Sequence, residues 1–218
     1  MFKELVFSTD APLESDAYVG GGARLPKSMS WPRSDSGLPL VHLLAFPVSW
    51  LSDAASPYWI SIFIPYEPGK VSHYRQLRMK SGESQAAVLI YERCKEIRNE
   101  SEGKIVGCGR IIVWENNGED DEENLASKID GVDSWLQAPL EIVDAKRRVS
   151  IYGGDLDLSI PENKGVLSDG MGYLLLSDDF VAGNLAAAHG FFCSSAKHWS
   201  DSKCDRPIRQ GDLIVSAP

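Results

Sequence analysis

Four side chains that could bind a metal ion lie close together near the end of the chain. His189, Cys193, His198 and Cys204 fall within sixteen residues, and zinc accepts thiolate and imidazole donors. Structural zinc sites usually present these donors as two close pairs, whereas the spacing here is irregular. Cys193 follows two phenylalanines, a context typical of a small buried hydrophobic residue. We therefore expect no bound metal and no other cofactor.

The same region contains the residue types of a nucleophilic triad. Ser194 and Ser195 lie near His198 and Asp201, and serine, histidine and aspartate together can attack an acyl group. The Gly-x-Ser-x-Gly turn that exposes such a serine in one large hydrolase class is absent. Because these residue types also occur together by chance, a polar loop after a strand explains them as well, and we expect that the protein is not an enzyme.

Paired carboxylates and a triple glycine are the remaining candidates for chemistry. On a strand, Asp155 and Asp157 would share one face, but they follow two glycines and have no identifiable acid–base partner. A calcium loop would need a fuller Asp-x-Asp-x-Asp-Gly pattern. Gly20, Gly21 and Gly22 are followed by Arg-Leu-Pro rather than by the Gly-Lys-Ser or Gly-Lys-Thr of a phosphate loop. We interpret these glycines as a structural turn.

Composition indicates a globular protein with an acidic surface. The chain has 218 residues, of which 43% are hydrophobic and 24% charged, so it can bury a core. The net charge is −9, and the sequence pI is about 4.9. Such a surface repels nucleic acids and acidic membranes and attracts basic partners. We expect a basic protein partner, no nucleic acid and no membrane.

Sorting signals and cysteine usage favour a cytoplasmic location. The first residues contain no apolar run long enough for a signal peptide, and no stretch approaches the length of a membrane helix. Cys94, Cys108, Cys193 and Cys204 form no close pair. Reduced thiols are the expected state of such cysteines in a cytoplasm.

A run of five consecutive carboxylates is the most charged segment of the chain. It consists of Glu119, Asp120, Asp121, Glu122 and Glu123. We expect all five side chains to be solvated, either in a surface loop or in the first turn of a helix. Charge runs of this kind are often interaction segments, so these residues are the candidates for binding a basic partner.

The elements that must position these residues are mostly strands. Apolar runs rich in β-branched and aromatic residues are bounded by proline, glycine and polar clusters. Segment 1–8 fits a short strand or helix, 9–39 is mostly loop, 153–161 is turn and edge, and 184–190 is a helical turn or two. The expected strands are 40–46, 58–65, 86–93, 104–114, 136–143, 149–152, 172–176, 190–193 and 208–215. Long amphipathic helices are missing, so we predict an α+β fold with mostly antiparallel sheets.

Two segments share an order of residues that suggests two related halves. In 18–51, glycines are followed by Trp31 and Pro32 and then by Pro-Leu and an apolar run. In 129–142, Gly131 is followed by Trp135 and again by Pro-Leu and an apolar run. Each Gly-to-Trp segment reads as a rigid loop that anchors its tryptophan on a buried strand. We predict one domain, 1–218, with pseudo-repeated halves of roughly 1–115 and 125–218 joined by the acidic run.

These motifs resemble the YwqG-like family, a domain of unknown function numbered 1963. The matching residues are Gly20-Gly21-x-x-x-Leu25-Pro26, Trp31-Pro32, Gly37-x-Pro39-Leu40-x-x-Leu43, Gly131-x-x-x-Trp135-x-Gln137 and the strand Gly172–Phe180. The resemblance spans most of the chain. It departs from the family at Ala45-Phe46, where a glutamine is usual, and at Gly22-Ala23-Arg24, which displaces the usual proline. A binding role for that glutamine is therefore not carried over.

The resemblance implies a function in bacterial competition. Members of the family occur beside bacterial toxins, and some are regarded as immunity proteins. The implied function is a cytoplasmic immunity protein that sterically blocks a secreted toxin, such as a nuclease effector of a type VI-like or other contact-dependent system. Such inhibition requires a complementary surface and no catalytic residues. Two alternatives remain open: a protein that binds a small molecule or carbohydrate between its halves, and a hydrolase with an unrecognised site.

Overall fold

A computed structural model describes most of the chain. The described residues are 2–52, 57–68, 70, 76–77, 85–102, 105, 108–136, 144–168, 170–185 and 187–195. Several predicted features lie outside these residues: Gln137, His198, Asp201, Cys204, nearly all of the expected strand 136–143 and all of 208–215.

The described chain folds into one antiparallel sheet of ten strands, with about 40% strand and 11% helix. The strands are β1 (Phe2–Ser8), β2 (Ala17–Gly20), β3 (Val41–Pro47), β4 (Tyr58–Ile64), β5 (Ala87–Glu92), β6 (Cys108–Asn116), β7 (Lys128–Ile129), β8 (Ala145–Tyr152), β9 (Met171–Ser177) and β10 (Gly190–Ser195). The helical elements are η1 (Val48–Trp50), α2 (Gly153–Ser159), η2 (Pro161–Asn163) and α3 (Asp178–Val181). The predicted antiparallel, strand-rich fold is confirmed.

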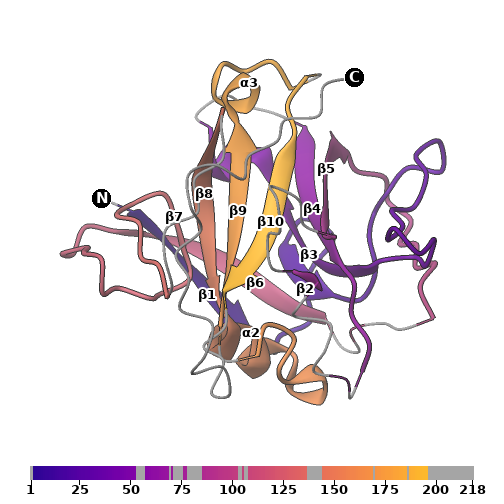
Figure 1. Ribbon diagram of the computed structural model, residues 1–218, viewed down its shortest axis with the longest axis horizontal. Coiled ribbons are helices and arrows are strands. Elements are labelled where there is room, and N and C mark those ends of the chain that lie inside the picture. Colours follow the sequence, from indigo (N-terminus) through magenta and orange to yellow (C-terminus); the bar gives the residue numbers. More distant parts are fainter. Residues whose placement is uncertain are drawn as a thin grey trace, which may run out of the picture.

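The sheet is built outward from a central pair, β1 and β6. Its order is β10-β9-β8-β7-β1-β6-β2-β3-β4-β5, so β1 carries β7–β10 on one side and β6 carries β2–β5 on the other. The sheet is nearly closed, because its edge strands β5 and β10 approach each other. Figure 1 shows α2 at one end of the sheet and α3 at the other, with β10 running on the side of the sheet where β5 lies.

The largest core lies inside this curved sheet. Apolar side chains of every strand except β5 are buried there, mostly at alternating positions, as the two-residue period of a strand requires. Leu44 and Ile62 are examples on one side, and Val149 and Leu174 are examples on the other. α2 adds Leu156 to the same core. Burial of these side chains supplies the main driving force for folding.

Two smaller cores lie on the outer face of the sheet, each covered by one Gly-to-Trp segment. Trp31 packs edge-to-face on Phe63 of β4, with ring centroids 5.1 Å apart. Trp135 packs on Tyr173 of β9, with ring centroids 4.5 Å apart. Both segments therefore cover outer-face residues that would otherwise expose apolar surface.

One local expectation is wrong, and two need an addition. The segment 9–39, predicted as mostly loop, also contains β2, whose residues pair with β3 and β6. The segment predicted as turn and edge is helix α2, because Leu156 and Ile160, four residues apart, both reach the main core. Residues 184–190, expected to form a helical turn or two, contain one such turn, in which the amide of Ala188 donates to the carbonyl of Asn184 at 3.0 Å; the nearby helix is α3. Among the described residues, no helix has the length and apolar character needed to cross a membrane.

Candidate functional site

The acidic run forms the connection between β6 and β7, as a surface loop and not a helix. Four of its carboxylates, those of Glu119, Asp121, Glu122 and Glu123, are exposed. The loop therefore presents four negative charges next to the end of the central strand β6.

Asp120 contradicts the expectation that all five carboxylates are solvated. Its side chain is only 5% exposed and lies 2.6 Å from the ammonium group of Lys128, which is fully buried in β7. The same carboxylate accepts hydrogen bonds from the amide of Val132, at 2.7 Å, and from the side chain of Asn124, at 2.9 Å. The reason is the sheet: β7 places a lysine under the loop, and a buried ammonium needs a buried anion.

The protonation of Asp120 follows from this environment. Burial alone would raise the pKa of its carboxyl group, but hydrogen bonds from Lys128, Val132 and Asn124 and the charge of Lys128 outweigh it. The pKa of Asp120 is therefore lower than that of an ordinary aspartate, and the ion pair persists at neutral pH.

Further hydrogen bonds fix the conformation of the loop. Ser134 donates its hydroxyl to the carbonyl of Asp121 at 3.1 Å, and the carboxylate of Asp121 accepts the amide of Glu123 at 2.9 Å. The exposed carboxylates are thus held on an ordered backbone, and an ordered loop loses little conformational entropy when a partner binds.

Gly131, one of the motif residues, has a direct role in this anchor. Its φ angle is +75°, which favours glycine, and a Cβ atom there would overlap the carboxylate of Asp120 and crowd Phe2. The absence of a side chain at Gly131 therefore lets Asp120 reach its site. Sequence reasoning found both residues but did not connect them.

Exposed apolar side chains lie beside the acidic loop on the outer face of the central strands. Trp114 of β6 is 62% exposed and shares a row across the sheet with Glu4 and Lys128, its successive register partners. Val6 of β1 pairs with Ile112 on the same face. We call this surface the central patch; it comprises Val6, Ile112, Trp114, Tyr152 and Leu158.

A groove of about 510 Å³ runs along part of the central patch. Val6, Tyr152 and Leu158 line it, together with the carboxylates of Glu4 and Asp155. The patch therefore combines apolar anchors with acidic neighbours. Sequence reasoning missed it because an exposed apolar residue on a strand cannot be told from a buried one until the faces of the sheet are known.

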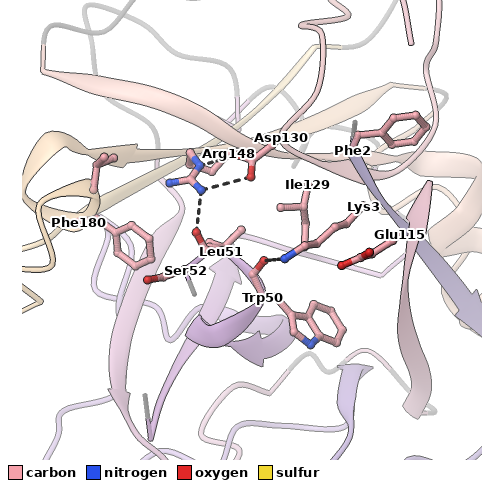
Figure 2. A pocket seen from close by; sticks show the side chains of 11 residues that line it. Phe2, Lys3, Trp50, Leu51, Ser52, Glu115, Ile129, Asp130, Arg148 and Phe180 are labelled. Atoms are coloured by element: carbon pink, nitrogen blue, oxygen red, sulfur yellow. Dashed lines mark hydrogen bonds and ion pairs between the residues drawn. The ribbon is translucent and has the colours of Figure 1, made fainter. Parts of the chain in front are cut away.

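A second cavity, of about 480 Å³, lies between the block β1–β6 and the block β7–β10 (Figure 2). The first block contributes Phe2, Lys3, Trp50, Leu51, Ser52 and Glu115, and the second contributes Ile129, Asp130, Arg148, Phe180 and Val181. The Lys3 ammonium donates to the carbonyl of Trp50 at 3.0 Å. Arg148 donates to the carbonyl of Leu51 at 2.8 Å and pairs with Asp130 at 2.6 Å. These contacts tie the two blocks together.

The remaining motif residues are placed in structural roles. Trp31 is 4% exposed, and its indole donates a hydrogen bond to the carbonyl of Leu40 at 2.7 Å. Pro32 accepts the amide of Leu40 through its carbonyl at 2.9 Å. Gly20 and Gly21 have φ angles of +72° and +70°, which glycine adopts readily. These residues shape the first Gly-to-Trp segment.

Those residues considered for metal binding or catalysis that the structure describes are not brought together into one site. Cys193 is fully buried beside Tyr173, and burial raises the pKa of its thiol to about 12. His189 packs on Phe191. Asp155 accepts the hydroxyl of Ser127 at 2.6 Å, whereas Asp157, on another side of α2, accepts the amide of Gly165. Within the part of the chain that the structure describes, no three metal-binding side chains cluster.

Comparison with known proteins leaves the geometry as the main guide to function. No family model and no curated protein matches the chain. The likeness to the YwqG-like family therefore rests on the motif residues alone. The surface that combines the acidic loop with the central patch is the candidate functional site.

Proposed function

We propose that this protein is an immunity protein that binds a basic toxin domain, such as a nuclease, and blocks it sterically. The observation that carries the proposal is the arrangement of four exposed carboxylates on an ordered loop beside the exposed ring of Trp114. The proposed site uses no catalytic group and no cofactor. A cytoplasmic location and a role in type VI-like or other contact-dependent competition are parts of the same proposal.

Electrostatics favours a basic partner. A nuclease carries a positively charged cleft for phosphates, and a protein of net charge −9 attracts such a surface over distances up to about a Debye length. Exposed charges at the rim of an interface mainly increase the association rate. Large aromatic side chains at its centre mainly slow dissociation. In this arrangement the acidic loop steers the toxin and Trp114 anchors it.

The steering role is tested by neutralising the exposed carboxylates without touching Asp120. The test variant is Glu119→Gln, Asp121→Asn, Glu122→Gln and Glu123→Gln. A control with the same change of net charge at other exposed positions is Asp35→Asn, Glu92→Gln, Glu102→Gln and Glu162→Gln. We expect slower association for the test variant, most clearly at low salt, and little change in dissociation. Equal association rates for both variants would remove the loop from the interface.

The anchoring role of Trp114 is tested by Trp114→Ala. Because the ring is exposed, the free energy of unfolding should change little. A loss of about 2 kcal/mol of binding energy would accelerate dissociation roughly thirtyfold. Leu38→Ala is the matched control, because Leu38 is equally exposed in the first Gly-to-Trp segment, outside the central patch. Unchanged dissociation in Trp114→Ala would place the anchor elsewhere.

The immunity function itself is tested by co-expression with the neighbouring toxin gene. Cells that produce the toxin should survive when this protein is present and die when it is absent. If they die as fast in both cases, the proposed function is wrong, whatever the binding experiments show.

We further propose that the chain consists of two repeated units, β1–β5 and β6–β10, which exchange their first strands. Two observations concern the strand order: β1 pairs with the meander β7–β10 of the other unit, and β6 pairs with the meander β2–β5. A third is that corresponding strands of the two units share an irregularity, because the register shifts between His42 and Leu44 in β3 and between Arg147 and Val149 in β8. These units differ from the predicted halves of roughly 1–115 and 125–218, because their boundary falls between β5 and β6 and the acidic loop lies inside the second unit. Separate fragments cut between β5 and β6 should fold only when mixed, as followed by circular dichroism. A single fragment that unfolds cooperatively would contradict the exchange.

The second candidate function is binding of a small molecule or carbohydrate in the cavity of Figure 2. The aromatic rings of Trp50 and Phe180 and the polar groups of Lys3 and Arg148 line this cavity together, and such combinations are typical of ligand sites. A screen of sugars and metabolites by thermal unfolding tests it. A hit that Trp50→Ala abolishes would favour this function over immunity.

A further inference from the structure

Two buried hydrogen-bond donors on the outer face of β2–β5 have no acceptor among the described residues. They are the hydroxyl of Tyr18, whose side chain is 4% exposed, and one terminal nitrogen of Arg93. Buried donors are normally paired, because an unpaired one loses its hydrogen bonds to water without replacement. Neither donor belongs to a site described above.

The sheet brings residues from several strands together around Tyr18. Tyr18 of β2 pairs with Ala45 of β3, and Ala45 pairs with Ser61 of β4, so the three side chains lie in one row on the same face. Ala45 and Ser61 are small, and the ring of His42 lies beside that of Tyr18, with centroids 5.3 Å apart. The hydroxyl of Ser61 lies 2.7 Å from that of Tyr91, which reaches the row from β5.

Two arginines border this row. The guanidinium group of Arg93 lies flat over the ring of Trp59, 3.7 Å from its centroid. Arg24 lies at the same end of β5: its carbonyl accepts the amide of Cys94 at 2.9 Å, and its guanidinium group donates to the carbonyl of Lys95. Burial and then the positive charge of Arg24 lower the pKa of Arg93. Burial raises the pKa of Tyr18, so its hydroxyl stays protonated and can donate.

Strand β7 occupies a position in the sheet that corresponds to that of β2, and there a buried donor does have a partner. Lys128 lies in β7 between β1 and β8, as Tyr18 lies in β2 between β6 and β3. The ammonium of Lys128 is met by Asp120 from the loop before β7. The loop before β2 carries Asp10 and Asp16, but both lie near Arg110, at 3.8 and 4.0 Å. The charge of Glu14, in the same loop, raises the pKa of Arg93, but no carboxylate of the described chain forms an ion pair or a hydrogen bond with Tyr18 or with the unpaired nitrogen of Arg93.

We propose that Tyr18, Arg24 and Arg93 bind an oxyanion, the carboxylate or phosphate group of a small ligand. The hydroxyl of Tyr18 and the free nitrogen of Arg93 donate hydrogen bonds to it, and Arg24 adds a second positive charge. Arginine forks and tyrosine hydroxyls suit both groups. The net charge of −9 repels anions from most of the protein surface, so we expect an anion to bind only where these donors lie together.

Inorganic phosphate and acetate serve as probes, each titrated at constant ionic strength and followed by thermal unfolding and calorimetry. We expect saturable stabilisation by at least one of them at concentrations up to about 10 mM. Comparison of the two shows whether the site prefers phosphate or carboxylate. Tyr18→Phe and Arg93→Gln should each weaken binding about tenfold, because each removes a hydrogen bond to a charged group.

Arg33→Gln is the control, since it changes the net charge equally at an exposed arginine whose guanidinium bonds only to the carbonyl of Gly37 among the described residues. It should bind like the unmodified protein. Three results would overturn the proposal: no saturable stabilisation by either anion, stabilisation that Arg93→Gln leaves intact, or an equal loss in Arg33→Gln and Arg93→Gln.

Discussion

Replacement of Asp120 by asparagine separates the one buried carboxylate of the acidic run from its exposed neighbours. The variant keeps the size of the side chain and an oxygen that can accept the amide of Val132. It removes the negative charge that faces the ammonium of Lys128 at 2.6 Å. Lys128 is fully buried, so its charge would remain without a counter-ion.

The expected loss of stability is large for a single substitution. Removal of one partner from a buried ion pair typically costs about 3–5 kcal/mol, and the retained amide oxygen of asparagine argues for about 3 kcal/mol. With a urea dependence of about 2 kcal/mol per molar, the midpoint of unfolding should fall by roughly 1.5 M. Asp121→Asn, at the exposed neighbour, should stay within about 0.5 kcal/mol of the unmodified protein.

A second substitution tests the mechanism of the loss. Lys128→Met removes the buried ammonium, so the double variant with Asp120→Asn should recover part of the stability that Asp120→Asn alone loses. Urea unfolding of all four proteins, monitored by tryptophan fluorescence and circular dichroism, gives the coupling energy directly.

The pH dependence supplies an independent check. The pKa of Asp120 is lower in the folded protein than in the unfolded chain, so the unfolded chain takes up this proton first on acidification. The contribution of Asp120 to the free energy of unfolding is therefore complete above the ordinary aspartate pKa of about 3.9. It is lost as the pH falls through the pKa that Asp120 has in the folded protein. Asp120→Asn should lack this part of the acid sensitivity. If Asp120→Asn and Asp121→Asn unfold at the same urea concentration, the buried ion pair is not stabilising and the reasoning fails.

Three further predictions concern other residues. Trp31→Ala should lower the free energy of unfolding in urea by about 3–5 kcal/mol, because the ring is buried and its indole donates a hydrogen bond to a carbonyl. Trp135 is partly buried, so Trp135→Ala should cost an amount near the lower end of this range. Unchanged unfolding midpoints would refute both anchoring roles. Burial lowers the pKa of His42 to about 4, so the free energy of unfolding should fall by about 3 kcal/mol as the pH decreases from about 6.5 to about 4. In His42→Asn the free energy of unfolding should depend much less on pH over this range. An unchanged pH dependence would mean that another group titrates. Elemental analysis of protein purified without chelator or affinity metal should find no stoichiometric zinc, and one zinc per chain would contradict our interpretation of residues 189–204.

Local sequence patterns were sufficient to predict much of the sheet. The run that forms β4 is aromatic and β-branched between two prolines, so its strand character is independent of what it pairs with. The same holds for β3, β5, β6 and β9, whose predicted positions overlap the observed ones. β2 was missed because four residues that end in glycine carry little local signal, and their conformation comes from pairing with β3 and β6.

The character of the acidic run could not be read from the sequence in full. Five adjacent carboxylates have the same charge and nearly the same local context, so all five were expected to be solvated. Tertiary structure distinguishes them: β7 buries Lys128, Gly131 leaves space above it, and Asp120 is the carboxylate that the loop presents there.

The sequence by itself determined the strand-rich class, the acidic surface and the two Gly-to-Trp segments, because each depends on residues that are close in the chain. Tertiary structure decided the sheet order, the central patch and the unpaired donors of Tyr18 and Arg93. These features arise when β1 pairs with β6 across more than a hundred residues. Such pairing sets which face each side chain occupies, and a local pattern contains no information about the partner strand.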